Sequence, residues 1–546
     1  MVSAHDACPI VGIGASAGGL KAFRELLRNL STETGMAYVL VQHLDPTQES
    51  LLPDLLARAT SMPVHEAQEG MDITANQVYV ITPNTDITLA QGRLHLFPRT
   101  EARGQHLSID TFLCSLAQAC TSRAMGVILS GTAADGTQGL QAIKAEGGMT
   151  FAQDPASAQF DGMPQSAIAA GCVDFVGSPQ AIARELTRIS RHPYVHQPPE
   201  VVQEQTIAKQ TASLGREPEF QQIVRLLSRR TGTDFTAYKP ATLRRRIGRR
   251  MALARSEQFT QYLSVLLDQP AEIEALYHDA LIGVTEFFRD GATFETLARE
   301  ILPALLAEKA PHALLRVWVP GCSTGQEVYS LAVCLLEFLA AHALSSSLQL
   351  FGTDASARAI ESARAGLYPA NVCQGLASTR LEHFFHPVNG GYQINKAVRD
   401  LCVFAQHDVL KDPPFSRIDL LSCQNVLIYL GAPAQKKVIQ SFHYALAPHG
   451  RLLLGPSETI GSASQLFAPV GEHKRQWYRK QTSGARSPGG SGEREVSQEA
   501  PASVREEGKN MESEQQPWAF DLQQETERLL ASFAPASVVV NAEMDV

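Results

Sequence analysis

The sequence lacks several features that would place it in a specialised class of protein. Its nine cysteines contain no C-x-x-C pair and are odd in number, so neither a disulfide framework nor a zinc ribbon is indicated, and we predict no metal site. No stretch approaches the ~20 uninterrupted apolar residues of a membrane span, and the first residues carry no basic signal segment. The formal net charge of −9 does not favour nucleic-acid binding. We expect a cytoplasmic protein with no nucleic-acid partner and no membrane insertion.

The composition is that of a globular protein with several domains. Apolar residues make up 44% of the chain and charged residues 19%. At roughly 150 residues for a domain, 546 residues are enough for three or four. Large hydrophobic cores are therefore expected.

Short apolar runs alternate with helical stretches in two parts of the chain. In residues 6–190 the runs include PIVGIGAS and MAYVLVQHL, and a proline-rich segment, residues 191–214, reads as a linker. Residues 215–275 carry helix signals, and residues 276–480 return to alternation, as in LLRVWVPG and RIDLLSCQNV. We predict an α/β fold class, with two doubly wound, mainly parallel-sheet domains, the second preceded by a helical cap subdomain.

The end of the chain has a different composition. Residues 481–516 are poor in apolar residues and rich in Gly, Ser, Pro and charge, so we predict a disordered linker. Residues 517–546 begin as an amphipathic helix and end on the strand-like SVVVN, which resembles the start of a PAS-type sensor domain.

The segment GIGASAGG, from Gly12 to Gly19, follows an apolar strand and precedes a helix. It has two interpretations: a dinucleotide-binding glycine turn, or a G-x-S-x-G nucleophile elbow that presents Ser16. Two further predicted strands lead to His43 and to a loop with Asp135. Because the carboxyl ends of parallel strands meet at one crevice, the three side chains can converge as a catalytic triad.

The motifs GIGASAGG, VQHLDP, LSGTAADG and AQDPASAQFDGMPQSAI resemble the catalytic domain of the chemotaxis protein-glutamate methylesterases, the CheB family. The resemblance implies Ser16 as nucleophile, His43 as base and Asp135 as its orienting partner, with no cofactor. The chain departs from the family at Ala17, where threonine is common, and at Thr132-Ala133-Ala134, where a methionine-glycine run is usual. The family's receiver domain is expected to be missing.

A second strand-turn-helix unit, VWVPGCSTGQEVYS, spans residues 317–330 and carries Glu327 in its first helical turn. The next strand, LQLFGTD, ends on Asp354, which could accept hydrogen bonds from a ribose or an adenine. This spacing alone fits NAD as well as another nucleotide-like cofactor. Polar residues at further strand ends, Asp408, Gln424, Asn425 and Tyr429, and the preceding GVTEFFRD with Thr285 and Arg289, add to the predicted pocket.

Together, residues 219–479 resemble the chemotaxis receptor glutamate methyltransferases, the CheR family. The resemblance implies an S-adenosyl-L-methionine pocket formed by Thr285, Arg289, Glu327, Asp354, Asp408, Gln424 and Asn425. The chain departs from the family at Gly283, Gln326 and Gln424, where asparagine, glutamate and arginine are usual. Because a glutamate carboxylate is ionised at neutral pH, it needs no base to attack a sulfonium methyl. Arg289 could hold this carboxylate and Tyr429 could help to aim it.

The predicted helix KPATLRRRIGRRMALAR places Leu243, Ile247 and Met251 on one face and Arg245 and Arg249 on another. A solvated helix on a core is one interpretation. In the resembling family this region contacts receptor helices, and a basic face would suit their glutamate-rich segments.

The leading hypothesis is a bifunctional enzyme that removes and adds methyl esters on glutamates of methyl-accepting chemoreceptor-type proteins. The resemblance also admits glutamine deamidation, and signalling kinase components as further partners. Two alternatives stay open: a dinucleotide-dependent oxidoreductase, and a scaffold that is non-catalytic or active in one domain alone.

Overall fold

The computed structural model describes residues 8–43, 51–98, 107–196 and 217–481, apart from 282, 284, 311, 345, 374, 389, 462 and 472–475. The predicted disordered linker after Gln481 and the predicted PAS-type start lie outside the described residues, as does most of the linker predicted at 191–214.

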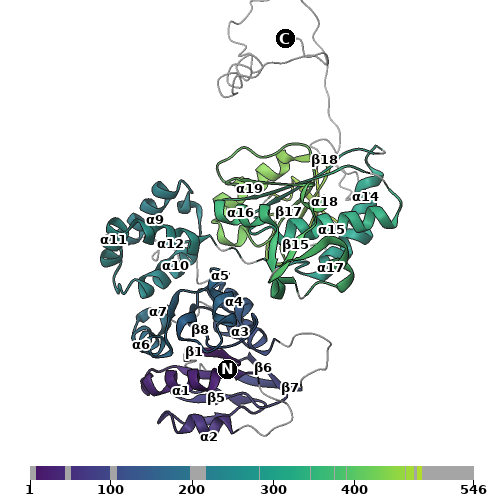
Figure 1. Cartoon of the computed structure of the whole chain (residues 1–546). Helices are drawn as coiled ribbons and strands as arrows, with labels where there is room; N and C mark the ends of the chain where they lie inside the picture. The colour runs from purple at the N-terminus through teal and green to yellow at the C-terminus, as the bar shows by residue number, and fades with distance from the viewer. Residues whose placement is uncertain are drawn as a thin grey trace, which may run out of the picture. The chain divides into compact units, whose positions relative to one another are not determined.

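The N-terminal domain is an α/β unit built on a parallel sheet with the strand order β10-β9-β8-β1-β2-β5-β3 (Figure 1). Every pairing in this sheet is parallel. Its elements are β1 (Ile10–Ala15), α1 (Gly19–Asn29), β2 (Ala37–Gln42), α2 (Leu52–Ala57), β3 (Val64–Glu66), β4 (Met71–Asp72), β5 (Val78–Val80), β6 (Thr85–Ala90), β7 (Arg93–Pro98), α3 (Ser108–Cys120), η1 (Thr121–Arg123), β8 (Ala124–Ile128), α4 (Thr137–Ala145), β9 (Met149–Gln153), η2 (Pro155–Ser157), α5 (Gly162–Ala169), β10 (Phe175–Gly177), α6 (Pro179–Ile189) and α7 (Pro193–His196).

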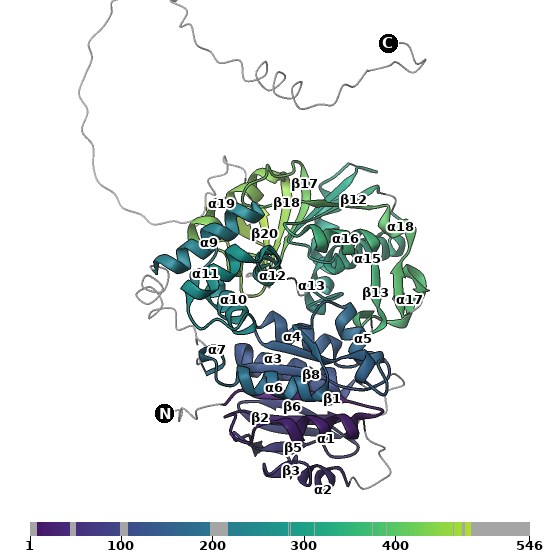
Figure 2. The same cartoon turned by 60° about the vertical axis from the view of Figure 1, so that its left-hand side comes forward.

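Helices cover both faces of this sheet because its strands are apolar on both sides. All six residues of β1 are buried, as expected for a central parallel strand. One core joins β1 to α1 and α6, and a second joins the opposite face to α3 and α4, which lie side by side (Figures 1 and 2). The chain leaves β1 toward β2 on one side and returns to β8 on the other, which makes the carboxyl end of β1 a topological switch point.

A helical subdomain follows, as the sequence predicts. It contains α9 (Pro218–Thr231), η3 (Phe235–Ala237), α10 (Pro240–Leu253), α11 (Phe259–Asp268) and α12 (Pro270–Ala280). Leu243, Ile247 and Met251 of α10 are all buried in its core, as their i, i+4, i+8 spacing predicts. The helix α12 continues across residue 275.

The third domain has a mainly parallel sheet in the order β16-β12-β11-β17-β18-β20-β19, with β20 antiparallel to its two neighbours. Its elements are α13 (Gly291–Thr296), the π-helix η4 (Leu297–Ile301), α14 (Leu302–Ala307), β11 (Leu315–Pro320), α15 (Gln326–Ala341), β12 (Leu348–Asp354), α16 (Ala357–Ala365), β13 (Leu367–Pro369), η5 (Ala370–Cys373), α17 (Ser378–Phe384), β14 (Phe385–Val388), β15 (Gly391–Ile394), α18 (Lys396–Arg399), β16 (Cys402–Gln406), β17 (Ile418–Cys423), η6 (Leu427–Tyr429), α19 (Ala432–Ala445), β18 (Leu446–Leu454), β19 (Phe467–Pro469) and β20 (Trp477–Lys480).

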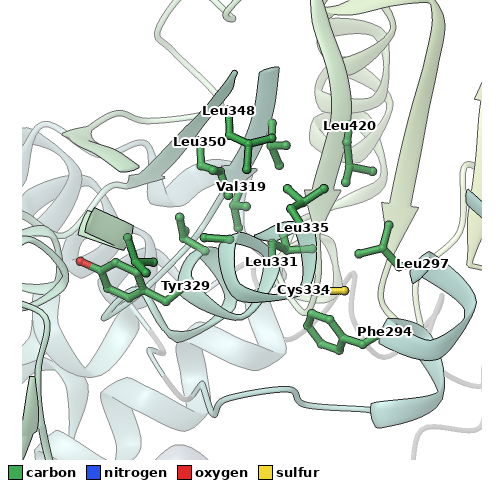
Figure 3. Packing of buried hydrophobic residues seen from close by; sticks show 14 of the residues in the cluster. Phe294, Leu297, Val319, Tyr329, Leu331, Cys334, Leu335, Leu348, Leu350 and Leu420 are labelled. Carbon is green, nitrogen blue, oxygen red and sulfur yellow. The ribbon is translucent and has the colours of Figure 1, made fainter. Parts of the chain in front are cut away.

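The core of this domain fixes the helix that follows the glycine turn. Leu331 and Leu335 of α15 pack among Val319 of β11, Leu350 of β12 and Leu420 of β17 (Figure 3). On the other face, α19 lies beside β17 and β18 (Figures 1 and 2). Strand β11 is again a switch point, between β12 and β17.

The expected fold class is confirmed: two parallel-sheet α/β domains, the second preceded by helices. Over the part of the chain that the structure describes, no helix is both long and apolar enough to cross a membrane.

Candidate active sites

The first site lies at the carboxyl ends of β1, β2 and β8. Ser16 directly follows β1, His43 directly follows β2, and Asp135 lies in the loop between β8 and α4. The Nδ1 atom of His43 is 3.2 Å from Ser16 Oγ, and its Nε2 atom is 2.7 Å from Asp135 Oδ2. The structure thus brings together the three side chains that the strand ends predict.

This geometry sets the protonation of the triad. Asp135 is only 1% exposed and can only accept a hydrogen bond when ionised, so His43 donates to it through Nε2 and presents Nδ1 as an acceptor for the serine proton. The carboxylate also accepts the backbone N–H groups of Ile109 and Asp110 at the start of α3. Asp135 is therefore held in place by a helix N-terminus as well as by the histidine.

The glycine turn after β1 prepares the site for an oxyanion. Gly18 has a φ of 75°, a conformation that glycine adopts without strain, and it is the N-cap of α1. The backbone N–H of Ser16 donates a hydrogen bond to the Ser130 carbonyl. The backbone N–H of Ala17 donates to no carbonyl among the described residues. The N–H of the residue after a nucleophile is the usual oxyanion donor, so we assign that role to Ala17.

A cleft of about 850 Å³ opens beside Ser16 and His43 and extends along α1. Lys21, Arg24 and Arg28 line it from one face of that helix, together with a single acid, Glu25. Glu25 accepts a hydrogen bond from the Gln180 side chain, while the Nε atom of Arg24 is buried without a partner among the described residues. The wall of the cleft is thus cationic.

The loop before Asp135 departs from the family pattern at Thr132-Ala133-Ala134, and one of these residues has an unusual backbone conformation. Ala133 has a φ of 66°, in the left-handed region that L-residues other than glycine rarely adopt. Gly131, two residues before Ala133, is closely packed: a Cβ there would lie 2.1 Å from Met163 Sδ, so Met163 would have to move.

The second site lies at the carboxyl ends of β11, β12, β16 and β17. Gly321 and Gly325 of the turn after β11 have φ values of 71° and 94°, which allow α15 to begin directly at Gln326. Asp354, the last residue of β12, accepts the N–H groups of Ser323 and Ser356 at 2.9 and 2.8 Å. Burial raises the pKa of Asp354, and these two backbone hydrogen bonds partly offset the increase.

Glu327 faces β17 from the first turn of α15. One carboxylate oxygen accepts hydrogen bonds from Ser422 Oγ at 2.5 Å and from Gln424 Nε2 at 3.2 Å. Burial raises the pKa of Glu327 to about 7, although both hydrogen bonds favour the charged form. A neutral glutamine where the family usually has arginine leaves this carboxyl without a strong counter-charge.

Several buried polar atoms at these strand ends have no partner among the described residues: Ser323 Oγ, His407 Nδ1 and Asp408 Oδ2. The other Asp408 oxygen accepts the Leu410 N–H. A buried polar atom without a partner costs free energy, so such a group of atoms fits a bound polar ligand. Donors and acceptors of a nucleoside suit this set, and Glu327 suits a cationic amino-acid end.

The other predicted pocket residues lie in two segments, the one after β17 and the one between α12 and α13. Burial raises the pKa of Tyr429 in η6, and the positive charge of Arg289 is one of the causes that lower it. The same charge lowers the pKa of Glu327. Arg289 is exposed and Thr285 is half-buried in the segment between α12 and α13. Asn425 has a φ of 59°, and its N–H donates to Glu458.

Sequence reasoning missed Glu458, Tyr238 and Tyr277. The buried Glu458 carboxylate accepts the N–H groups of Asn425, Val426 and Leu427 at 2.7–3.0 Å, and so shapes the loop after β17. Tyr277 of α12 donates a hydrogen bond to the Ala355 carbonyl. Burial, followed by the negative charges of Asp408 and Asp354, raises the pKa of Tyr238. Strand-end spacing gives no signal for Tyr238 and Tyr277, because they belong to the helical subdomain. Glu458 does follow a strand, β18, whose carboxyl end lies beside that of β17.

The expected basic face of α10 is only partly a free surface. Arg249 is 0% exposed and forms ion pairs with Asp174 and Asp279, and its Nε donates to the Gly148 carbonyl. Arg245 is half-buried and 3.9 Å from Glu146. The expectation that Arg249 faces an acidic partner molecule is therefore wrong, because acids of this chain already neutralise it.

Taken together, the first site is that of a serine hydrolase on a parallel sheet, and the second is a cofactor pocket of the methyltransferase type. Residues 11–186 match the model of the CheB methylesterase family, and the chain belongs to that family. Residues 218–281 and 283–475 match the all-alpha domain and the SAM binding domain of CheR methyltransferase, so the chain is a fusion of the two.

Individual relatives cover the same ranges. A putative protein-glutamate methylesterase/protein-glutamine glutaminase of Leptospira interrogans is 34% identical over 33% of this chain and 94% of its own length. Chemotaxis protein methyltransferase 2 of Pseudomonas aeruginosa is 28% identical over 46% of this chain and 91% of its own. A Rhodobacter capsulatus protein of 104.1 kDa is 37% identical over 78% of this chain, which spans only 46% of that relative.

Proposed function

We propose that this chain hydrolyses γ-methyl esters of protein glutamates with its first site and methylates protein glutamates from S-adenosyl-L-methionine with its second. The observation that carries the proposal is His43, hydrogen-bonded at once to a serine hydroxyl and a buried carboxylate. The orphaned buried polar atoms around Asp354 and Asp408 support the second activity.

In the proposed hydrolysis, Ser16 Oγ attacks the ester carbonyl while His43 Nδ1 takes its proton. Asp135 stabilises the imidazolium through the Nε2–H, and the Ala17 N–H donates to the oxyanion. Methanol leaves with the proton from His43, and water then hydrolyses the acyl-enzyme by the same steps. A side-chain amide could be cleaved likewise with loss of ammonia, so glutamine deamidation is included in the proposal.

In the proposed methylation, S-adenosyl-L-methionine supplies an electrophilic methyl group when bound. Asp354 and Asp408 would hold its nucleoside, Glu327 with Gln424 its methionyl end, and Thr285 and Asn425 the remaining edge. Arg289 would orient the attacking glutamate carboxylate and Tyr429 would support that orientation. No base is required, because the carboxylate is already ionised at neutral pH.

The proposed substrates are methyl-accepting chemoreceptor-type proteins, with signalling kinase components as further partners. The cationic wall of the esterase cleft supports an acidic substrate segment. We also propose a cytoplasmic location, which the nine free cysteines support. The domain limits we propose are 6–190, 215–280 and 281–480; the second limit follows Ala280 rather than residue 275, since α12 continues to that point.

The proposal is tested separately for each site. Isothermal titration of the full chain with S-adenosylhomocysteine should detect binding that is lost in Asp354→Ala, whereas a degenerate scaffold would not bind at all. Methanol release from a peptide with a glutamate methyl ester should depend on Ser16. Hydrolysis that persists in Ser16→Ala would rule out the proposed esterase.

A further inference from the structure

A second buried acid, Asp110, contacts Asp135 of the triad. It lies in the first turn of α3 and is 3% exposed, and its own backbone N–H donates to Asp135 Oδ1 at 2.8 Å. Its side-chain Oδ1 accepts the Gly139 N–H of α4 at 2.7 Å. Each acid therefore binds the N-terminal turn of the helix that belongs to the other. The Asp135 carboxyl group accepts N–H groups at the start of α3, which contains Asp110, and the Asp110 carboxyl group accepts an N–H at the start of α4, which follows Asp135.

No lysine or arginine among the described residues forms an ion pair with Asp110 or Asp135. Among the described residues, the single ion-pair partner of either carboxyl group is His43, on Asp135. Oδ2 of Asp110 is buried and receives no hydrogen bond from any described donor. Two carboxylates so placed in a buried environment cannot both be ionised, so one of them holds a proton.

Asp110 is the acid that holds the proton. Burial, followed by the negative charge of Asp135, raises the pKa of Asp110 to about 8, and a side-chain hydrogen bond with Asp135 is a further cause. Asp135 instead accepts hydrogen bonds from His43 and from two helix N–H groups. A protonated Asp110 has one O–H group and needs one acceptor, and the Asp135 carboxylate is that acceptor.

We propose that Asp110 is a positioning residue of the esterase, whose neutral carboxyl group donates a hydrogen bond to the Asp135 carboxylate and so fixes the acceptor that orients His43. This inference rests on the proposed function of the first site and adds a fourth member to its hydrogen-bond chain. Above the pKa of Asp110 the donor is lost and a second buried negative charge appears beside Asp135. Esterase activity is then expected to fall on the alkaline side, near pH 8.

The test measures kcat/KM of the full chain against pH, with a synthetic peptide that carries a glutamate γ-methyl ester. The rate of Ser16→Ala is subtracted at each pH to remove base hydrolysis. In Asp110→Asn the amide donates to Asp135 at every pH and its oxygen still accepts the Gly139 N–H. We expect near wild-type activity at neutral pH, and loss of the alkaline decline near pH 8. Asp110→Leu removes the donor and should lower kcat/KM about tenfold or more at neutral pH.

Asp54→Asn is the matched control, because Asp54 is an exposed acid in the first turn of α2. Its pH profile should equal that of the wild type. An Asp110→Asn profile that keeps the wild-type alkaline decline would overturn the inference, whether or not Asp110→Leu folds. Failure of the proposed function looks different, since the wild type itself would then release no Ser16-dependent methanol.

Discussion

The side-chain amide of Gln424 donates a hydrogen bond of 3.2 Å to the carboxylate of Glu327, and no full positive charge contacts that carboxylate among the described residues. The pKa of Glu327, raised to about 7 by burial, follows from this environment. Near neutral pH, the second site therefore exists in two protonation states.

Cofactor affinity should depend on pH through Glu327. The ionised carboxylate attracts a cationic amino-acid end, so affinity should rise as pH increases through about 7. If only the ionised form binds well, the Kd falls about tenfold between about pH 6 and about pH 8. In Gln424→Arg the added charge lowers the pKa of Glu327 and shifts the rise to lower pH. Titration calorimetry with S-adenosylhomocysteine measures this, and identical affinities at both pH values in the wild type would contradict it.

The cationic wall of the first cleft should select acidic substrates. Arg28→Gln should raise KM about two- to fivefold for an acidic methyl-ester peptide, as expected for loss of one exposed ion pair. Arg24 is half-buried, and Arg24→Gln should raise KM at least as much. A neutral peptide with the same ester should be hydrolysed as before, since Ser16 and His43 are unchanged. Arg58→Gln, which removes an exposed charge outside the cleft, is the control. Equal effects on both peptides would contradict substrate selection by charge.

The strained backbone before Asp135 predicts a stabilising substitution. Ala133→Gly relieves a left-handed alanine and should raise the free energy of unfolding by up to about 1 kcal/mol, less the added entropy of the unfolded glycine. Ala169→Gly, at the exposed last position of helix α5, should instead destabilise by less than about 1 kcal/mol. A lower melting temperature in Ala133→Gly than in the wild type would show that the strain is absent.

The helical subdomain contains a half-buried ion pair between α10 and α12. Arg250 binds both oxygens of Glu272 at 2.9 and 2.6 Å, and Tyr262 donates to the same carboxylate at 2.8 Å. Glu272→Gln removes the two charge-assisted hydrogen bonds of Arg250 and leaves Asp279, 4.0 Å away, as its remaining acidic partner, so it should cost roughly 2 kcal/mol. The exposed pair of Lys396 and Asp400 provides the control, because Lys396→Ala should cost less than about 1 kcal/mol. Urea unfolding measures both changes. Equal destabilisation by the two substitutions would contradict the claim that the less exposed pair contributes more to stability.

The sequence predicted those features that depend on where a parallel strand ends. Ser16, His43 and Asp135 follow three strands that are neighbours in one sheet, so their convergence follows from topology. Glu327 and Asp354 follow from the same rule in the second sheet. Apolar spacing likewise predicted the buried stripe of α10.

The roles of Asp110 and Glu458 could not be predicted in this way. Both act through backbone N–H groups of another element, at Gly139 of α4 and in the loop that begins at Asn425. Charge on a helix face was equally ambiguous, since Arg249 is buried and neutralised by acids distant in sequence. Such pairings depend on tertiary contacts and leave no periodic pattern.

The most direct test of two opposed activities in one chain follows a labelled methyl group. The full chain is incubated with tritiated-methyl S-adenosylmethionine and a receptor fragment, and protein-bound label and released methanol are counted over time. In the wild type we expect label to appear on carboxylates and then to be released as methanol. In Ser16→Ala it should accumulate without release, and in Asp354→Ala it should never appear. Label that is equally labile in the wild type and Ser16→Ala, or no carboxylate label in any protein, would contradict this expectation.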